Sequence, residues 1–479
     1  MTSHSPTAEI TNHPRAWFAL ALILAAEVMD LLDASIVNVA APVISRELHA
    51  DSAALQWITG GYSLTFAVFL IAGARLGDRF GRKRLFLVGA WGFVAFSLLC
   101  AVAPSTGVLL AGRLLQGIAA ALLIPQGFSI LFAIFRPSDL GKAFSIFGPV
   151  VGLAAVAGPV LGGLLVSMDL FGTSWRLVFL INIPIGVFAA VGATRIFPEA
   201  RLDVAPRLDW VGMILFGLAA GLIVYPLVQG REAGWPAWTY FMVVGALATL
   251  VILAMWTRRR FRQNREPLVR MSIFSHRGFS SGVLITIVFF AGTFGVGLAM
   301  TLFLQLGLGF TAVQAGTTAA ANALGSSLSA LLAGAVLVPR LGRKTLQLGA
   351  ALQAVGLILV ITIVLLQGTQ VTGWSLAGPL FIWGVGIGLI IAPLFDFVLA
   401  SLDEEEIGSG SGVLNTLQQF GTAVGVAILG TIFFSTVGES VTGDPAYVTG
   451  FVGTALVGLG FALAVFALVP LLPRMPRDE

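Results

Sequence analysis

Charged residues are scarce in this sequence: they make up 10% of its 479 residues, whereas hydrophobic residues make up 57%. An average soluble domain carries about 25% charged residues. This chain therefore has too few of them to cover a surface that faces water. The composition excludes a water-soluble globular fold and predicts a protein that lies in a lipid bilayer.

Cysteine, histidine and nucleotide-binding motifs are also lacking. The single cysteine, Cys100, excludes an internal disulfide and a cysteine-rich metal site. There are four histidines and no HExxH motif, so nothing indicates a metalloenzyme, and no GxxxxGK[ST] loop occurs that would bind ATP phosphates. We therefore expect neither an enzyme nor a metal or cofactor.

Long apolar segments fill the sequence instead. A helix needs about 20 mostly apolar residues to span a bilayer. Glycine, proline and charge clusters divide the chain into fourteen segments of this kind, at 16–44, 55–76, 84–103, 106–135, 141–168, 175–197, 208–228, 238–256, 279–306, 313–338, 344–366, 373–400, 409–434 and 449–472. We predict an all-α polytopic membrane protein with 14 transmembrane helices.

The basic residues give the orientation of these spans, because cytoplasmic loops hold an excess of lysine and arginine. With a cytoplasmic N-terminus, 22 of the 27 basic residues fall on the cytoplasmic side, and only Arg46, Arg176 and Arg231 fall outside. Losing one span would place the cluster at 258–277 or that at 340–344 on the wrong side. We therefore predict that both termini are cytoplasmic and that the net charge of +4 reflects orientation, without nucleic-acid binding.

Two similar loop sequences indicate an internal repeat. Residues 73–83 read GARLGDRFGRK and residues 334–344 read GAVLVPRLGRK, with seven identities in eleven at an offset of 261. Both follow a span that exits on the same side, as in transporters built from two parallel six-helix halves; the alternative is a basic turn that recurs by chance. We predict a tail (1–15), an N-terminal half (16–200), an inserted helix pair with its connectors (201–272), a C-terminal half (273–473) and a second tail (474–479).

Three acidic residues lie inside the first apolar segment. Glu27, Asp30 and Asp33 are three residues apart, so they share one face of a helix. A carboxylate at mid-membrane costs about 2.5–3.5 kcal/mol, and neighbouring like charges repel, so we expect at least one of them to carry a proton. We predict a proton-coupling face on which Glu27, nearest the midplane, is the first choice for the coupling site and Asp33 lies higher, in the outer half; the alternative is a structural hydrogen-bonding network.

One base, Arg113, lies inside the fourth segment at about the depth of Asp33, and Gln116 follows on the same helix face. An unpaired arginine in lipid is costly, so we expect Arg113 to pair with a helix-1 acid. A proton that reached this acid would weaken the pair and favour a second conformation. Asp396, near the cytoplasmic end of the twelfth segment, is interpreted as a helix-end acid.

Together these features resemble the major facilitator superfamily and, within it, the fourteen-span drug:proton antiporter family. LDASIVNVAAP (32–42) is similar to the LDxTIVNVALP of that family's first helix, and RLGDRFGRKR (75–84) to the superfamily's loop between helices 2 and 3. AGPVLGG (157–163) is similar to the antiporter signature of helix 5. The resemblance covers essentially the whole chain.

The resemblance also implies roles for individual residues. Asp33, Arg113 and Gln116 would handle the proton or the substrate. Conformational exchange at the cytoplasmic face would depend on the loop residues, and antiport on small residues of helix 5; these two sets are Asp78, Arg79, Gly81 and Arg82, and Gly158, Pro159 and Gly162.

The resulting prediction is a monomeric, proton-driven antiporter that exports small amphipathic or cationic compounds by alternating access. Its partners would be cargo, protons and lipid. An excess of arginine over lysine, with abundant alanine and glycine, is typical of GC-rich bacterial genomes, so we expect a bacterial plasma membrane. The alternatives are a metabolite importer, a lipid-handling transporter, and a receptor or scaffold; AGPVLGG disfavours the first, and the buried acids disfavour the last.

Overall fold

The computed structural model describes residues 15–135, 137–168, 172–198, 209–231, 233–263, 271–438 and 444–473. Within these ranges the chain is helical and contains no strand. Residues 1–14 of the predicted tail 1–15, the predicted tail 474–479, and residues 199–208 and 264–270 lie outside the described residues.

The first part of the chain forms six long helical segments, and the sixth is broken into three consecutive pieces. The elements are α1 (Ala16–Leu48), α2 (Ser52–Phe80), α3 (Arg82–Ala101), α4 (Thr106–Ile134), α5 (Pro137–Met168), and then η2 (Ser174–Arg176), α6 (Leu177–Leu180) and α7 (Asn182–Ile196). Each coincides with one predicted segment, although α2 and α5 begin three to four residues earlier than predicted.

The last part of the chain forms six further segments, two of which contain a π-helical turn. They are η3 (Met271–Ser275) with α10 (Arg277–Leu302) and η4 (Phe303–Gly307), α11 (Ala312–Leu332) with η5 (Ala333–Leu337) and α12 (Val338–Leu341), α13 (Lys344–Gln367) with η6 (Gly368–Gln370), α14 (Gly373–Leu399), α15 (Glu404–Val437), and α16 (Pro445–Leu468) with η7 (Val469–Leu471).

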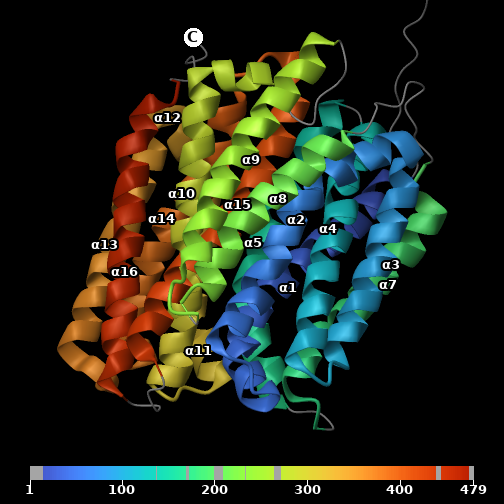
Figure 1. Cartoon of the computed structure of the whole chain (residues 1–479). Helices are drawn as coiled ribbons and strands as arrows, with labels where there is room; N and C mark the ends of the chain where they lie inside the picture. The colour runs from blue at the N-terminus through green and yellow to red at the C-terminus, as the bar shows by residue number, and fades with distance from the viewer. Residues whose placement is uncertain are drawn as a thin grey trace, which may run out of the picture.

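The two parts repeat the same packing. Five helix pairs of the first part recur in the second: α1–α5 as α10–α15, α1–α7 as α10–α16, α2–α4 as α11–α14, α3–α4 as α13–α14 and α3–α7 as α13–α16. Two contacts join the parts, α2 with α15 and α5 with α11. Because α2 corresponds to α11 and α5 to α15, these two contacts are equivalent to each other. In Figure 1 the blue and teal helices form one side of the molecule, and the yellow to red helices form the other.

Two helices lie between these parts in the sequence. They are α8 (Trp210–Gln229) and α9 (Ala237–Arg262), which pack against each other. Of the two, α8 also packs against α2 and α15, so the pair covers the boundary between the two sides, as the green ribbons show (Figure 1).

The repeated loop sequence is also a repeat of backbone form. Gly81 ends α2 with φ of 102°, and Gly342 ends α12 with φ of 53°. Positive φ is readily available to glycine and strained for other residues. The glycine that the two loops share is therefore the residue that allows each chain reversal.

Twelve helical segments among the described residues are long and apolar enough to cross a membrane. They do not include α1 and α5, which are 33 and 32 residues long. An all-helical, multi-pass membrane protein is thus confirmed, whereas the count of fourteen and the sidedness of the termini stay predictions.

Candidate functional site

A buried ion pair joins α1 to α4. Arg113 donates through Nη1 to Asp33 Oδ2, and the two side chains are 1% and 0% exposed. Arg113 Nε also donates to the carbonyl oxygen of Ile58 at 3.1 Å, and its guanidinium lies 4.5 Å from the centroid of the Tyr62 ring. The predicted pairing of Arg113 with a helix-1 acid is confirmed, and the acid is Asp33.

Two amides complete the surroundings of the Asp33 carboxylate. Asn182 Nδ2 donates to Asp33 Oδ1 at 2.7 Å, and Gln116 Nε2 donates to the same oxygen at 3.3 Å. Gln116 Oε1 accepts from Arg113 at 3.0 Å, while Gln116 Nε2 also donates to Ser97 Oγ at 2.8 Å. Each of these three neighbours donates to Asp33, and an ionised carboxylate is a group that only accepts.

The other two acids of α1 are buried beside this pair but have different partners. Asp30 accepts a hydrogen bond from the Tyr62 hydroxyl. Glu27 is 8% exposed, and its Oε1 accepts no hydrogen bond. The predicted common burial of the three acids is confirmed. Asp33 accepts hydrogen bonds from three side chains, whereas Glu27 has one oxygen that can still accept a hydrogen bond.

The predicted loop residues lie at the junction of α2 and α3. Asp78 pairs with Arg82 at 3.1 Å, and Arg82 also donates to the carbonyl oxygen of Ser129 on α4 at 3.1 Å. Gly81 forms the turn between them. Arg79 is exposed and lies against the Phe80 ring, so the loop brings Asp78, Gly81 and Arg82 together and leaves Arg79 apart.

Glycines of the predicted helix-5 signature let α5 lie close to two neighbours. A Cβ at Gly158 would overlap Ser35 Oγ of α1, and one at Gly162 would lie 3.3 Å from Ile36 Cα of the same helix. On the other face, Pro159 contributes a carbonyl oxygen to a close contact with α11. The signature therefore places α5 between α1 of its own side and α11 of the other.

Gly163→Ala is expected to loosen this contact. The new Cβ would lie 2.5 Å from the carbonyl oxygen of Ala312 and 2.8 Å from Val313 Cα, and backbone atoms cannot rotate away as a side chain can. We expect a loss of about 1–3 kcal/mol in stability, seen as a lower midpoint of thermal unfolding. Gly453→Ala on α16, where nothing lies within 4 Å, is the matched control and should be neutral or slightly stabilising.

Three residues of the central cluster were not found from the sequence: Tyr62, Ser97 and Asn182. Asn182 interrupts the apolar run LVFLINIPIGVF (177–188), so an amide within an apolar segment was the available signal. Tyr62 and Ser97 carry no such signal, because tyrosine and serine are ordinary residues of membrane helices.

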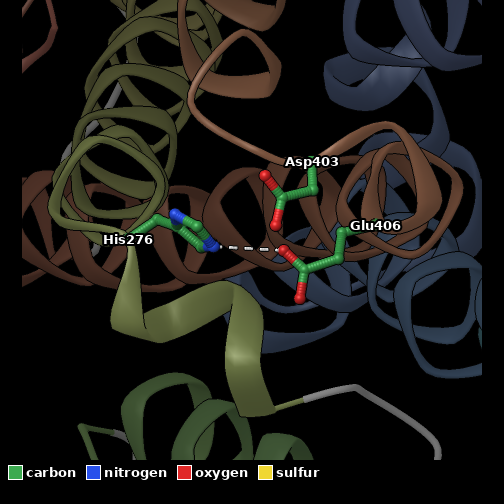
Figure 2. A group of neighbouring side chains, drawn as sticks. All are labelled: His276, Asp403 and Glu406. Carbon is green, nitrogen blue, oxygen red and sulfur yellow. Dashed lines mark ion pairs between the residues drawn. The ribbon is translucent and has the colours of Figure 1, made fainter.

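A second group of ionisable side chains lies in the last part of the chain, next to α10 and α15. Figure 2 shows His276 directed at Glu406, with Nε2 and Oε2 3.2 Å apart, and Asp403 beside them. Ser272 also donates to Glu406 at 2.5 Å. Asp403 is the N-cap of α15 and Glu406 lies in its first turn, where acids stabilise a helix. This group therefore connects the segment before α10 to the start of α15.

The sequence was also compared with the sequence models of known protein families. The model of the Major Facilitator Superfamily matches residues 23–210 and 206–426, which is most of the chain. This chain belongs to the Major Facilitator Superfamily. The family predicted from the sequence motifs is thereby confirmed, and the protein is a membrane transporter.

Several curated relatives share much of the sequence. A probable actinorhodin transporter of Streptomyces coelicolor is 44% identical over 90% of this chain and 74% of its own length. A puromycin resistance protein of Streptomyces alboniger is 34% identical over 97% and 92%, and a tetracenomycin C resistance and export protein of Streptomyces glaucescens is 32% identical over 91% and 79%.

Solved structures confirm the fold of this transporter. A POT family transporter in complex with 5-aminolevulinic acid superposes with a TM-score of 0.68, covering 97% of this chain and 98% of its own. Its sequence is 15% identical, so the likeness establishes the arrangement of the helices and says nothing of cargo.

Proposed function

We propose that this transporter is a proton-coupled antiporter that exports small amphipathic or cationic compounds, antibiotics among them, by alternating access. The buried Asp33–Arg113 pair with its neighbouring acids is the observation that carries this proposal. The names of the relatives support it, since they include an actinorhodin transporter and resistance proteins for puromycin and tetracenomycin C.

The proton would act on Asp33. Ionised, this carboxylate holds Arg113 and Gln116 on α4 and Asn182 on α7; protonated, it loses the charge that stabilises Arg113. Because α1 packs against α5, and α5 against α11 of the other side, a change at α1 reaches the boundary between the halves. The membrane potential supplies about 2.3 kcal/mol per charge per 100 mV, so entry of a proton can drive cargo out without any cofactor.

The remaining sequence predictions belong to this proposal. The chain would cross a bacterial plasma membrane fourteen times as a monomer, with both termini cytoplasmic, halves at 16–200 and 273–473, and an inserted pair at 201–272. Repeated helix packing and the position of α8 support the division into halves and an insert. Asp78, Gly81 and Arg82 would control exchange between conformations through their contact with α4.

Transport in inverted vesicles tests this function. The full chain is reconstituted with a trapped pH-sensitive dye, a proton gradient is imposed, and puromycin and actinorhodin are added as separate probes. Uptake of either probe that dissipates the gradient supports antiport. Movement of the probe in the same direction as protons would identify an importer, and proton movement that no probe alters would contradict a coupled exporter of these compounds.

Glu27→Gln is expected to lower efflux of a cationic probe about tenfold, because a buried carboxyl group with one oxygen free of hydrogen bonds is available to a positive cargo group. Stability should stay the same or rise, since the change removes an ionisable group from a buried position. Glu47→Gln is the matched control: Glu47 lies at the other end of α1 and pairs with Arg176 at 3.2 Å in a partly exposed bridge. Equal efflux of cationic probe by wild type and Glu27→Gln would exclude Glu27 as a binding group.

A further inference from the structure

Among the described hydrogen bonds, Asn182 is the residue of α7 that binds the Asp33–Arg113 pair. Its amide nitrogen is hydrogen-bonded, and its amide oxygen is not. Nδ2 donates to Asp33 Oδ1 at 2.7 Å and lies 3.4 Å from Ser97 Oγ. The side chain is 0% exposed, yet its carbonyl oxygen, Oδ1, has no hydrogen-bond partner. Burial of an amide oxygen without a donor is unfavourable, so a purely structural role leaves this orientation unexplained.

A protonated Asp33 needs an acceptor that the ionised form does not. The carboxylic acid gains an O–H donor, whereas the present neighbours of Asp33 all donate. Arg113 has no acceptor atom. Gln116 Oε1 already accepts from Arg113 at 3.0 Å and faces Cys100 Sγ at 3.4 Å. Asn182 Oδ1 is therefore the vacant acceptor on a residue that touches Asp33.

We propose that Asn182 is a positioning residue that changes its amide orientation with the protonation of Asp33. Half a turn about the terminal side-chain bond exchanges Nδ2 and Oδ1, which differ little in size. In the present orientation Nδ2 donates to the ionised carboxylate, and in the rotated orientation Oδ1 accepts from the protonated acid. Both protonation states of Asp33 therefore keep a hydrogen bond to α7. This inference rests on the proposed function, in which Asp33 exchanges the coupling proton.

None of the ionisable groups around Asp33 accepts a hydrogen bond from it among the described contacts. Around Asp33 they are Asp30 on the same helix, Tyr62 on α2, Cys100 on α3 and Arg113 on α4. The hydroxyl of Tyr62 donates to Asp30, and the Arg113 guanidinium only donates. Glu27 lies one turn beyond Asp30 and adds no contact to Asp33 among the described hydrogen bonds.

Infrared spectroscopy of the full chain in lipid vesicles tests the change of orientation directly. We expect the pH-difference spectrum to contain a side-chain amide carbonyl band that changes together with the carboxyl band of Asp33, and that is absent from Asn182→Leu. A carboxyl band that titrates without any amide change would overturn the inference and leave the proposed function intact. If no Asp33 band titrates at all, the coupling role of Asp33 fails and the switch fails with it.

The pH profile of efflux supplies the second test. Asn182→Leu removes one bond from each state, so we expect a maximal rate about tenfold lower and a half-maximal pH that moves by less than about 0.5. An amide that served only the ionised state would instead raise the half-maximal pH by about 1–2 units when removed, and that result would contradict the inference. Asn182→Ser, whose hydroxyl both donates and accepts, should recover part of the rate.

A matched control separates this role from packing. Gln353 on α13 is also buried, donates through Nε2 to Thr293 Oγ1 at 3.0 Å, and has an unbonded Oε1. Its partner is a hydroxyl that does not titrate in this range. We expect Gln353→Leu to show neither the amide band change nor a tenfold loss of rate; an equal loss in both variants would overturn the inference.

Discussion

Asp33→Asn is expected to abolish proton-driven efflux, with a fall of about 10²–10⁴-fold in its initial rate. Asparagine has the shape of aspartate but has no carboxyl group that binds and releases a proton, and its amide nitrogen would face donors from Asn182 or Gln116. Arg113 would lose its counterion while it stays 1% exposed. The measurement is dissipation of an imposed proton gradient by cargo in inverted vesicles, compared with the amount of folded protein in the membrane.

The control for this substitution is Asp51→Asn. Asp51 is the N-cap of α2, where its carboxylate accepts from the backbone nitrogen of Ala54 at 2.7 Å. Asparagine caps helices about as well as aspartate, so efflux should be unchanged. Proton-driven efflux at the wild-type rate in Asp33→Asn would show that the proton is carried elsewhere, and Glu27 or Asp30 would become the acids to test.

Arg113→Lys is expected to lower efflux at least tenfold and stability by about 1–3 kcal/mol, although the charge is retained. The guanidinium donates from Nε to Ile58 and from Nη1 to Asp33 and Gln116, and stacks on Tyr62. An ammonium lacks this planar fork, so it cannot reach these partners together. The measurements are thermal unfolding of the purified protein and efflux per folded molecule; wild-type values for both would contradict the proposed geometry.

A double substitution separates stability from transport at this pair. Removal of one partner of a buried ion pair costs about 3–5 kcal/mol, whereas replacement of both by apolar residues of similar volume is often neutral. We therefore expect Asp33→Leu with Arg113→Met to unfold at a higher temperature than Arg113→Met alone and still to lack proton-driven efflux. Recovery of efflux together with stability would reduce the pair to a structural role.

The sequence predicted those parts of the site that depend on helix geometry alone. Glu27, Asp30 and Asp33 share a face because their spacing matches one turn of helix, whatever surrounds them. The repeat of residues 73–83 at 334–344 was likewise readable from the sequence, and in the structure its shared glycines, Gly81 and Gly342, end their helices with positive φ. Such features follow from a few neighbouring residues, and a pattern in the sequence is enough to find them.

The choice of partners could not be predicted in the same way. The sequence placed Arg113 at about the depth of Asp33 and indicated a pair with a helix-1 acid. It gave no sign that Asp30 accepts a hydrogen bond from Tyr62. Asn182 is 149 residues from Asp33 and reaches it because α7 packs against α1 and α3. Contacts between distant helices depend on the depth and rotation of each helix, and these result from packing over the whole bundle.

By itself, then, the sequence determined that this protein lives in a membrane, that its two parts repeat, and that three acids share a face of the first helix, because apolar length, identity and helical period are local properties. Only the tertiary structure decided which acid is held by Arg113, which stays without a hydrogen bond at one oxygen, and which amide completes the pair. Those outcomes depend on where helices far apart in the chain meet, and close packing of side chains decides that meeting point.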